Sequence, residues 1–249
     1  MSDDLSRFEN LTYDDFRRLA TDETLTPYER IGFPTSYREG KEELIFDDLL
    51  RKLPALDSRD RRVLDVGPGC STLPRLLIDH CAARGHELIL VDSSEMLEQL
   101  PDAREITKLA GSFPDEQNLQ GSDGTIDVAI VYSVLHYVFA EGNLFAFLDR
   151  LLALLAPGGA ALLGDIPNVS KRRRFFASSA GIAFHKEFMQ TDDAPPATFN
   201  EPAPGAIDDA VVFSLLARAR AAGCDAYVVP QPQELPMANR REDVLITRP

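Results

Sequence analysis

The chain has 249 residues, of which 44% are hydrophobic and 27% are charged. This composition is ordinary for a soluble globular protein, and the length suits one well-buried domain better than two. The net charge of −14 disfavours nucleic acids and anionic membranes as partners, because their phosphates would be repelled.

Cysteine usage and the N-terminus exclude further classes. Cys70, Cys81 and Cys224 are far apart and odd in number, so they form no CxxC pair and no Cys/His metal spacing. Reduced thiols are the simplest interpretation. The first ten residues are acidic and polar, unlike a secretory signal, and no apolar run approaches the roughly 20 residues of a membrane span. We therefore expect a cytoplasmic protein without a bound metal.

The N-terminal quarter is strongly charged and helical in pattern. Leu44, Ile45, Leu49 and Leu50 recur at helical spacing inside a helix predicted over 37–53. An aromatic and turn-rich segment, 28–38, precedes it. We predict a helical cap or lid over residues 1–58, in front of a core domain over residues 59–249.

From residue 62 onward, short apolar runs alternate with helical segments. Strands are predicted over 63–66, 87–92, 106–112, 126–135 and 160–166. Helices are predicted over 71–84, 94–100, 143–155 and 207–222. The alternation predicts an α/β fold, with a Rossmann-like, mostly parallel sheet and helices on both faces. Residues 168–206 break the rhythm and are predicted to be an insertion of a short helix and a loop. Two late runs, 226–229 and 244–247, are predicted to form an antiparallel hairpin at the sheet edge.

A glycine-containing turn follows the first predicted strand. That strand carries Asp65, and the turn reads Gly67-Pro68-Gly69, where glycine lets the backbone turn sharply and a ligand approach closely. Ligands of open α/β sheets bind at the carboxyl ends of the strands. The second strand ends in Asp92, whose carboxylate can accept hydrogen bonds from both hydroxyls of a ribose. The sequence therefore predicts a nucleoside-containing cofactor at this edge.

Two kinds of cofactor fit this architecture. The dinucleotide fingerprint GxGxxG requires a third glycine at position 72, where this chain has Thr72. Asp65 would repel a pyrophosphate, but it suits the cationic amino and sulfonium groups of S-adenosylmethionine. An NAD(P)-dependent oxidoreductase stays open as the alternative.

Five motifs in order carry a more specific resemblance. They are VLDVGPGCS (63–71), VDSSEML (91–97), AGSFPD (110–115), IDVAIVYSVLHYV (126–138) and LLAPGGAALLGD (154–165). Together they resemble the class I S-adenosylmethionine-dependent methyltransferases over residues 60–167. The late helix and two strands fit the same seven-stranded fold, whose last strand is antiparallel. The departure is Ser71, where many members have a third glycine.

The resemblance implies a cofactor-binding set, with S-adenosyl-L-methionine as cofactor and S-adenosyl-L-homocysteine as product. Near the methionine part it would comprise Asp65, Gly67, Pro68 and Gly69. Asp92 would hold the ribose, with Ser93 and Met96 on the adenine side. Ser112 and Phe113 would flank the adenine ring, and Tyr132 and Ser133 would close the site from the fourth strand.

Methyl transfer is an in-line displacement that depends mainly on alignment of the two reactants, and an oxygen or nitrogen acceptor can also need a base. His136, Asp165 and His185 are the candidates for that base or for orienting the acceptor. Each also has a structural interpretation: His136 could pack at a helix start, Asp165 could cap the turn at 168–170, and His185 lies in the irregular insertion. His80 and His86 are expected to face solvent.

The basic run 171–174 stands out in an acidic chain. It is either a solvated helix face or a clamp for an anionic acceptor, in which Arg172 and Arg173 would bind substrate. Tyr37 and Arg38 could contact the carboxylate of the cofactor or the acceptor, or simply pack on the sheet.

A weaker resemblance concerns the acceptor. The segments GFPTSYREGKEE (32–43), GDIPNVSKRRRFF (164–176) and GIAFH (181–185) resemble a subgroup of methyltransferases found with bacterial surface-glycan biosynthesis genes. This implies a small-molecule acceptor and O-methylation of a sugar, a nucleotide-sugar or a phosphoryl-linked compound. A non-catalytic partner subunit that binds S-adenosylmethionine also stays open, and the oligomeric state is not predicted.

Overall fold

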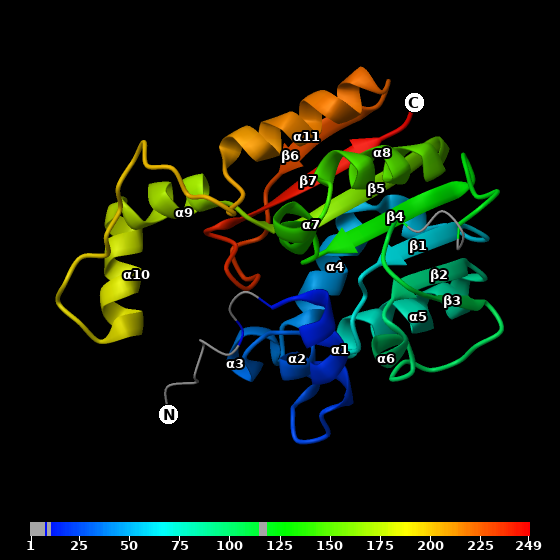
Figure 1. The fold of residues 1–249 in the computed structure, drawn as a ribbon, viewed down its shortest axis with the longest axis horizontal. Helices are drawn as coiled ribbons and strands as arrows, with labels where there is room; N and C mark the ends of the chain where they lie inside the picture. Colours follow the sequence, from blue (N-terminus) through cyan, green and yellow to red (C-terminus); the bar gives the residue numbers. More distant parts are fainter. Residues whose placement is uncertain (1–7, 9–10, 115–118) are drawn as a thin grey trace.

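A seven-stranded sheet with the order β3-β2-β1-β4-β5-β7-β6 organises the chain (Figure 1). The structure, a computed structural model, describes residues 8, 11–114 and 119–249; residues 1–7, 9 and 10 of the predicted cap lie outside them, as does Asp115 of the third motif. The strands are β1 (Arg62–Val66), β2 (Glu87–Asp92), β3 (Ile106–Ala110), β4 (Ile126–Tyr132), β5 (Leu155–Pro167), β6 (Asp225–Val229) and β7 (Arg241–Thr247). Strands β1 to β5 pair in parallel, and β7 is antiparallel to both β5 and β6. The predicted fold class and the late hairpin are therefore confirmed.

Helices cover both faces of this sheet. The N-terminal part holds α1 (Tyr13–Thr21), α2 (Pro27–Arg30), α3 (Thr35–Arg38), α4 (Glu42–Lys52) and the short 3-10 helix η2 (Pro54–Asp57). The remainder holds α5 (Thr72–Arg84), α6 (Ser94–Leu97), α7 (Leu135–Glu141), α8 (Leu144–Leu154), α9 (Val169–Phe176), α10 (Ser179–Met189) and α11 (Asp209–Ala221). Successive residues of a strand point to opposite faces, so Val63 belongs to the apolar cluster that includes residues of α4 and α5, while Leu64 belongs to the cluster that includes residues of α8 and α11.

The strand order places the site. β1 pairs with β2 on one side and with β4 on the other, so the chain order reverses at the carboxyl end of β1. In open α/β sheets a ligand crevice forms at such a switch point. The Gly67 turn leaves β1 there, anchored by a 2.8 Å hydrogen bond from the Gly67 amide to the carbonyl of Val91.

Three element boundaries differ from the sequence-based prediction. The helix predicted over 37–53 is divided into α3 and α4, because Gly40 adopts a left-handed backbone with φ of 69°. Strand β5 begins at Leu155 and runs through Pro157-Gly158-Gly159, so this segment belongs to the strand and not only to the end of a helix. The insertion at 168–206 contains two helices, α9 and α10, where we expected one.

Buried polar contacts join the N-terminal helices to the sheet. Lys52 of α4 forms ion pairs with Asp48 and, at 2.6 Å, with the fully buried Asp243 of β7. The prediction that His80 and His86 face solvent is wrong. The His80 side chain is only 8% exposed, and its Nε2 contacts the Leu56 carbonyl. The His86 side chain is buried, where one ring nitrogen accepts from the Arg61 amide and the other contacts the Leu56 carbonyl. No helix in the described ranges is both long and apolar enough to cross a membrane.

Candidate active site

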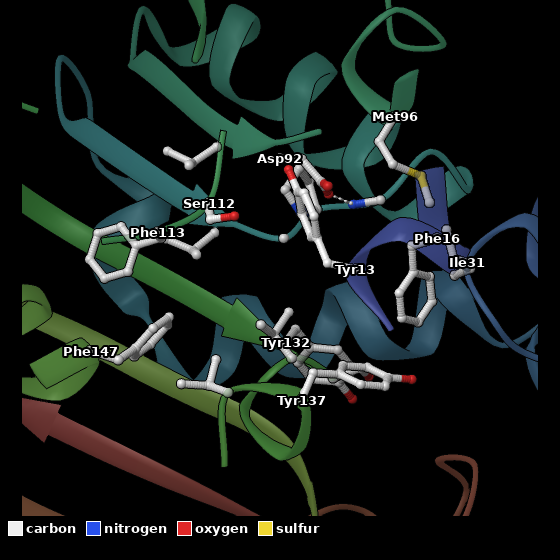
Figure 2. Close-up of a pocket in the computed structure, with 18 of the residues that line it drawn as sticks. Tyr13, Phe16, Ile31, Asp92, Met96, Ser112, Phe113, Tyr132, Tyr137 and Phe147 are labelled. Atoms are coloured by element: carbon white, nitrogen blue, oxygen red, sulfur yellow. Dashed lines mark hydrogen bonds between the residues drawn. The ribbon is translucent and has the colours of Figure 1, made fainter. Parts of the chain in front are cut away.

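A cavity of about 500 Å³ lies at the carboxyl ends of β1, β2 and β4 (Figure 2). From the N-terminal part, residues of α1, of α3 and of the segment between α2 and α3 also line it. Nine of the eleven predicted cofactor-binding residues line it: Gly67, Pro68, Gly69, Asp92, Met96, Ser112, Phe113, Tyr132 and Ser133. Asp65 and Ser93 are buried and do not line the cavity. The residues drawn from four separate motifs therefore meet around one space.

The turn after β1 has room only for glycine at two positions. Gly67 and Gly69 have φ of 70° and 68°. A Cβ on Gly67 would lie 2.5 Å from Val134 Cγ2, and a Cβ on Gly69 would lie 2.7 Å from Ile31 Cγ2. Both glycines thus let the backbone itself form the cavity wall, where its polar groups can meet a ligand.

Asp92 holds this turn in place. Its Oδ2 accepts from the Gly69 amide at 2.9 Å, and its Oδ1 accepts from the Ser93 amide at 2.7 Å. Burial raises the pKa of Asp92 to about 6, against the opposing effect of these two hydrogen bonds. Each oxygen keeps a lone pair, so a diol in the cavity could donate to both.

Asp65 carries a second buried carboxyl close behind the turn. Burial and the neighbouring charge of Asp92 raise the pKa of Asp65 to about 8. Among the described residues, no cationic side chain forms an ion pair with either carboxylate. A cationic ligand group would compensate this unfavourable burial.

The far side of the cavity is apolar and aromatic. Phe113 and Phe147 meet edge to face, with ring centroids 4.8 Å apart, and Ser112 lies beside Phe113 (Figure 2). Met96 lies on the opposite side, where the Ser93 hydroxyl caps the start of α6 by accepting from the Met96 amide. Such a slot fits a flat heterocycle with a polar edge.

Arg38 enters the cavity from α3 although only 3% of its surface is exposed. Its guanidinium lies 4.2 Å from the Phe33 ring centroid and donates to Ser133 Oγ at 2.6 Å. Asp165 Oδ2 accepts from Ser133 and lies 3.5 Å from the same guanidinium. This network fixes a positive charge at the cavity wall.

The two strand-end partners of Arg38 have strained backbones. Ser133 and Asp165 have φ of 61° and 57°, in the left-handed region that these residue types seldom occupy. Such strain, about 1–3 kcal/mol for each residue, occurs mainly where a structure aims a side chain at a site. The alternative in which Asp165 caps the turn at 168–170 is wrong, because Asn168 caps α9 with its own side chain.

Several cavity residues carry no sequence signal that would have indicated them. Tyr13 extends from α1 across the cavity with its ring beside Asp92 (Figure 2), and its hydroxyl is hydrogen-bonded to Ser112. Phe16 of α1 meets Tyr137 of α7 edge to face at 4.9 Å. Glu42 of α4 accepts from Ser71 Oγ and from the Leu73 amide, so it caps the start of α5. Tyr13, Phe16 and Glu42 lie outside the five motifs. Tyr137 lies inside the fourth motif, at a position to which no role was assigned.

The three proposed acid–base residues do not line the cavity. His136 is the second residue of α7 and stacks against Tyr137, with ring centroids 3.9 Å apart, while its Nδ1 is buried without a hydrogen-bond partner among the described residues. Burial lowers the pKa of His136 to about 3. Asp165 is bound to Ser133 as described above. His185 lies on α10, where its ring is 6.1 Å from that of Phe176.

Only one of the four proposed substrate-binding residues lines the cavity. Arg38 lines the cavity and Tyr37 does not. Arg172 lies over the Phe176 ring at 5.4 Å, and Arg173 donates to the Glu201 carbonyl at 2.7 Å. Both residues belong to α9 and do not line the cavity.

The donor set fits S-adenosylmethionine. Asp92 can take the ribose hydroxyls, the Phe113 side can take the adenine, and the glycine turn leaves the backbone free for the methionine part. The buried carboxyl of Asp65 suits a cation, and Arg38 suits a carboxylate. A pyrophosphate would instead face two buried carboxyls. Among the described residues, no group of His, Cys, Asp and Glu side chains is placed to hold a metal ion.

Comparison with known families now decides the class. The family model described as a methyltransferase domain matches residues 37–194, which is more than half of the chain. The chain belongs to this methyltransferase family. Enzymes of this family and fold take the methyl group from S-adenosylmethionine, which is the cofactor of this methyltransferase. No protein of curated function matches the sequence closely.

Solved structures agree on the fold. The methyltransferase is similar to the N-methyltransferase NodS from Bradyrhizobium japonicum in complex with S-adenosylhomocysteine, with 14% identity, a TM-score of 0.56, and coverage of 95% of this chain and 98% of that chain. A chain from the complex of the Haloferax volcanii Trm112 methyltransferase activator with a methyltransferase matches with 14% identity, a TM-score of 0.56, and coverage of 94% and 98%. The CurJ carbon methyltransferase matches with 18% identity, a TM-score of 0.54, and coverage of 97% and 65%.

Proposed function

We propose that this methyltransferase methylates an oxygen of a small, anionic acceptor, such as a sugar phosphate, a nucleotide-sugar or another phosphoryl-linked compound. The observation that carries the small-molecule assignment is the cavity itself, which is about 500 Å³ in volume and is lined in part by residues of α1 and α3. An acceptor that reaches the methyl group must share this space with the cofactor.

In this proposal the cofactor lies along the carboxyl ends of β1, β2 and β4. Asp92 binds the ribose and Arg38 binds the carboxylate, while Asp65, buried behind the glycine turn, attracts the positively charged methionine part without contacting it. The bound cofactor supplies an electrophilic methyl group on a sulfonium. The protein contributes by holding that group and the acceptor in line.

His136 would orient the acceptor and not act as a strong base. An imidazole with a pKa of about 3 holds a proton poorly at neutral pH. Its buried Nδ1 lacks a partner, and it would bond an acceptor hydroxyl only where the acceptor extends past the cavity lining. An anion bound nearby would raise this pKa and improve the imidazole as a base. Asp165 would act as a positioning residue for Arg38, and His185 would contribute from α10 only if the acceptor extends that far.

The anionic class of the acceptor rests on charge. In a chain of net charge −14, three consecutive arginines lie on α9, which follows β5, and Arg241 of β7 pairs with Pro167 at the end of β5. If residues 1–58 act as a cap, the acceptor would lie between this cap and these arginines.

The test is release of S-adenosylhomocysteine from S-adenosylmethionine with paired acceptors. Each sugar phosphate or nucleotide-sugar is compared with the free sugar, with catechol and simple amines as additional acceptors. The proposal expects turnover with at least one phosphorylated compound and little with its free sugar. Turnover with only uncharged phenols or amines would contradict it.

A further inference from the structure

Arg240 is a partly buried cation without an anionic partner. It ends the segment between β6 and β7, where its carbonyl accepts from the Asn168 amide at 3.0 Å. No carboxylate in the described part of the chain forms an ion pair with it. Burial lowers the pKa of Arg240, and the nearby cations Arg241 and Arg172 lower it further, against an opposing contribution of Tyr37. The guanidinium nevertheless stays charged at any physiological pH.

Arg172 provides a second cation beside it. The Arg240 carbonyl binds the N-cap of α9, and Arg172 lies in the first turn of that helix, with its amide bonded to the Asn168 carbonyl at 2.9 Å. The Phe176 ring, 5.4 Å from the Arg172 guanidinium, supports its position. Arg172 also forms no ion pair among the described residues.

The neighbouring cations differ from these two because each has an anionic or carbonyl partner. Arg174 pairs with Asp209, Lys171 donates to the Arg241 carbonyl, and Arg241 lies 3.8 Å from Asp165. The two unpaired guanidiniums therefore repel each other in an otherwise acidic protein. A bound anion would remove that repulsion.

Unsatisfied polar atoms occur in the same region. Asn239, next to Arg240, has a buried Oδ1 without a hydrogen-bond partner among the described residues, and His136 Nδ1 is in the same state. The nearby charge of Arg241 also lowers the pKa of His136. Buried polar atoms are seldom left unpaired. The Asn239 oxygen can only accept a hydrogen bond, so it indicates a hydroxyl or amine donor of a ligand and not the anionic group itself.

This region adjoins the cofactor cavity. Tyr37 approaches Arg240, while Arg38, the next residue of α3, lines the cavity. Consecutive helical residues point about 100° apart, so α3 can direct Arg38 toward the cofactor cavity and Tyr37 toward Arg240. Figure 1 shows the segment between β6 and β7 lying between α9 and the N-terminal helices.

We propose that Arg172, Arg240 and Tyr37 form a binding site for a phosphoryl group of the methyl acceptor. Two guanidiniums and a phenol supply donors for at least three oxygens, which matches a phosphate better than a carboxylate. This inference rests on the proposed function, since it assigns the anionic part of the acceptor to the wall beyond Arg38. Of the basic run, Arg172 would bind the phosphoryl group together with Arg240 and Tyr37. Arg174 would not, because it pairs with Asp209.

The experiment titrates inorganic phosphate into the protein saturated with S-adenosylhomocysteine, followed by phosphorus NMR. The variants are Arg240→Gln and Arg172→Gln, and Arg174→Gln on the same helix is the control with an equal loss of charge. Thermal unfolding checks that each variant is folded, and acetate and sulfate serve as competing anions.

We expect Arg240→Gln and Arg172→Gln each to weaken phosphate binding at least tenfold. The control should change it less than twofold, and no variant should change the affinity for S-adenosylhomocysteine. Absence of phosphate binding in the wild-type protein, equal weakening in Arg174→Gln, or displacement of phosphate by equimolar acetate would overturn the proposal. Failure of S-adenosylhomocysteine to bind would instead contradict the proposed function, and the phosphate titration of the free protein would still test the anion site.

Discussion

Replacement of Asp65 by asparagine should stabilise the cofactor-free protein, and increasingly so as the pH rises. Asp65 is 6% exposed, and burial together with Asp92 raises its pKa from 3.8 to about 8. A carboxyl whose pKa is raised on folding stabilises the folded state below its unfolded pKa, and this contribution is lost as the pH rises through the folded value. The Asn variant has the same shape and no charge, so it avoids that loss.

The structure gives the magnitude of this effect. Each pKa unit corresponds to about 1.4 kcal/mol, so the advantage of the variant should grow by about 1.4 kcal/mol per pH unit between pH 5 and 8. A shift of roughly four units limits the total to about 5 kcal/mol, on the order of the whole stability of many domains.

Urea unfolding of both proteins at pH 6, 7 and 8 measures this difference. Asp102→Asn is the matched control, since the Asp102 side chain is 94% exposed and its effect should not vary over this range. The variant should also bind S-adenosylhomocysteine at least tenfold more weakly, because it lacks the buried carboxyl behind the glycine turn, which a nearby ligand ammonium would ionise and pair with through space. A difference in unfolding free energy that is constant from pH 6 to 8 would refute the reasoning.

Three further predictions concern Gly67, Arg38 and His136. Gly67→Ala should abolish measurable S-adenosylhomocysteine binding in calorimetry, since its Cβ would lie 2.5 Å from Val134, whereas Gly158→Ala, with a φ of 78° and open space around it, should cost only the backbone strain of about 1–2 kcal/mol in thermal unfolding. Arg38→Gln should destabilise the protein by about 3 kcal/mol in urea unfolding and weaken S-adenosylhomocysteine binding, because the buried Asp165 loses the nearer of its two guanidiniums and keeps only Arg241 at 3.8 Å; unchanged values for both would count against the assigned role. The imidazole of His136 should stay neutral down to pH 4 in proton NMR titration, and a midpoint near 6.5 would show that it is not buried as described.

The sequence predicts those parts of the site that local rules determine. The Gly67 turn and Asp92 at a strand end follow from the order of strands and turns, since the carboxyl ends of parallel strands share one edge. Phe113 was expected only from the resemblance to the methyltransferases, and its partner Phe147 was not expected. The antiparallel hairpin follows from the short spacing of its two strands. The longer β5 was missed because Pro157 and Gly158 are helix-stop residues as well as strand-entry residues.

Long-range contacts could not be predicted in this way. Tyr13 and Glu42 reach the cavity because α1 and α4 fold back over the sheet, and nothing within their own segments indicates that partner. The same holds for Arg240, whose neighbours Tyr37 and Arg172 are distant in sequence. The depressed pKa of His136 likewise depends on burial by surrounding elements and not on its position in the motif.

Calorimetric titration of the purified protein with S-adenosylhomocysteine tests the central claim most directly, with NAD as the control ligand and Asp92→Asn as the control protein. The variant places an amide where Asp92 now accepts from two backbone amides, so both the glycine turn and the ribose contacts should suffer. The account predicts micromolar binding of S-adenosylhomocysteine, no binding of NAD, and at least a hundredfold weaker binding by the variant. Tight binding of NAD, or equal affinity of the variant for S-adenosylhomocysteine, would contradict it.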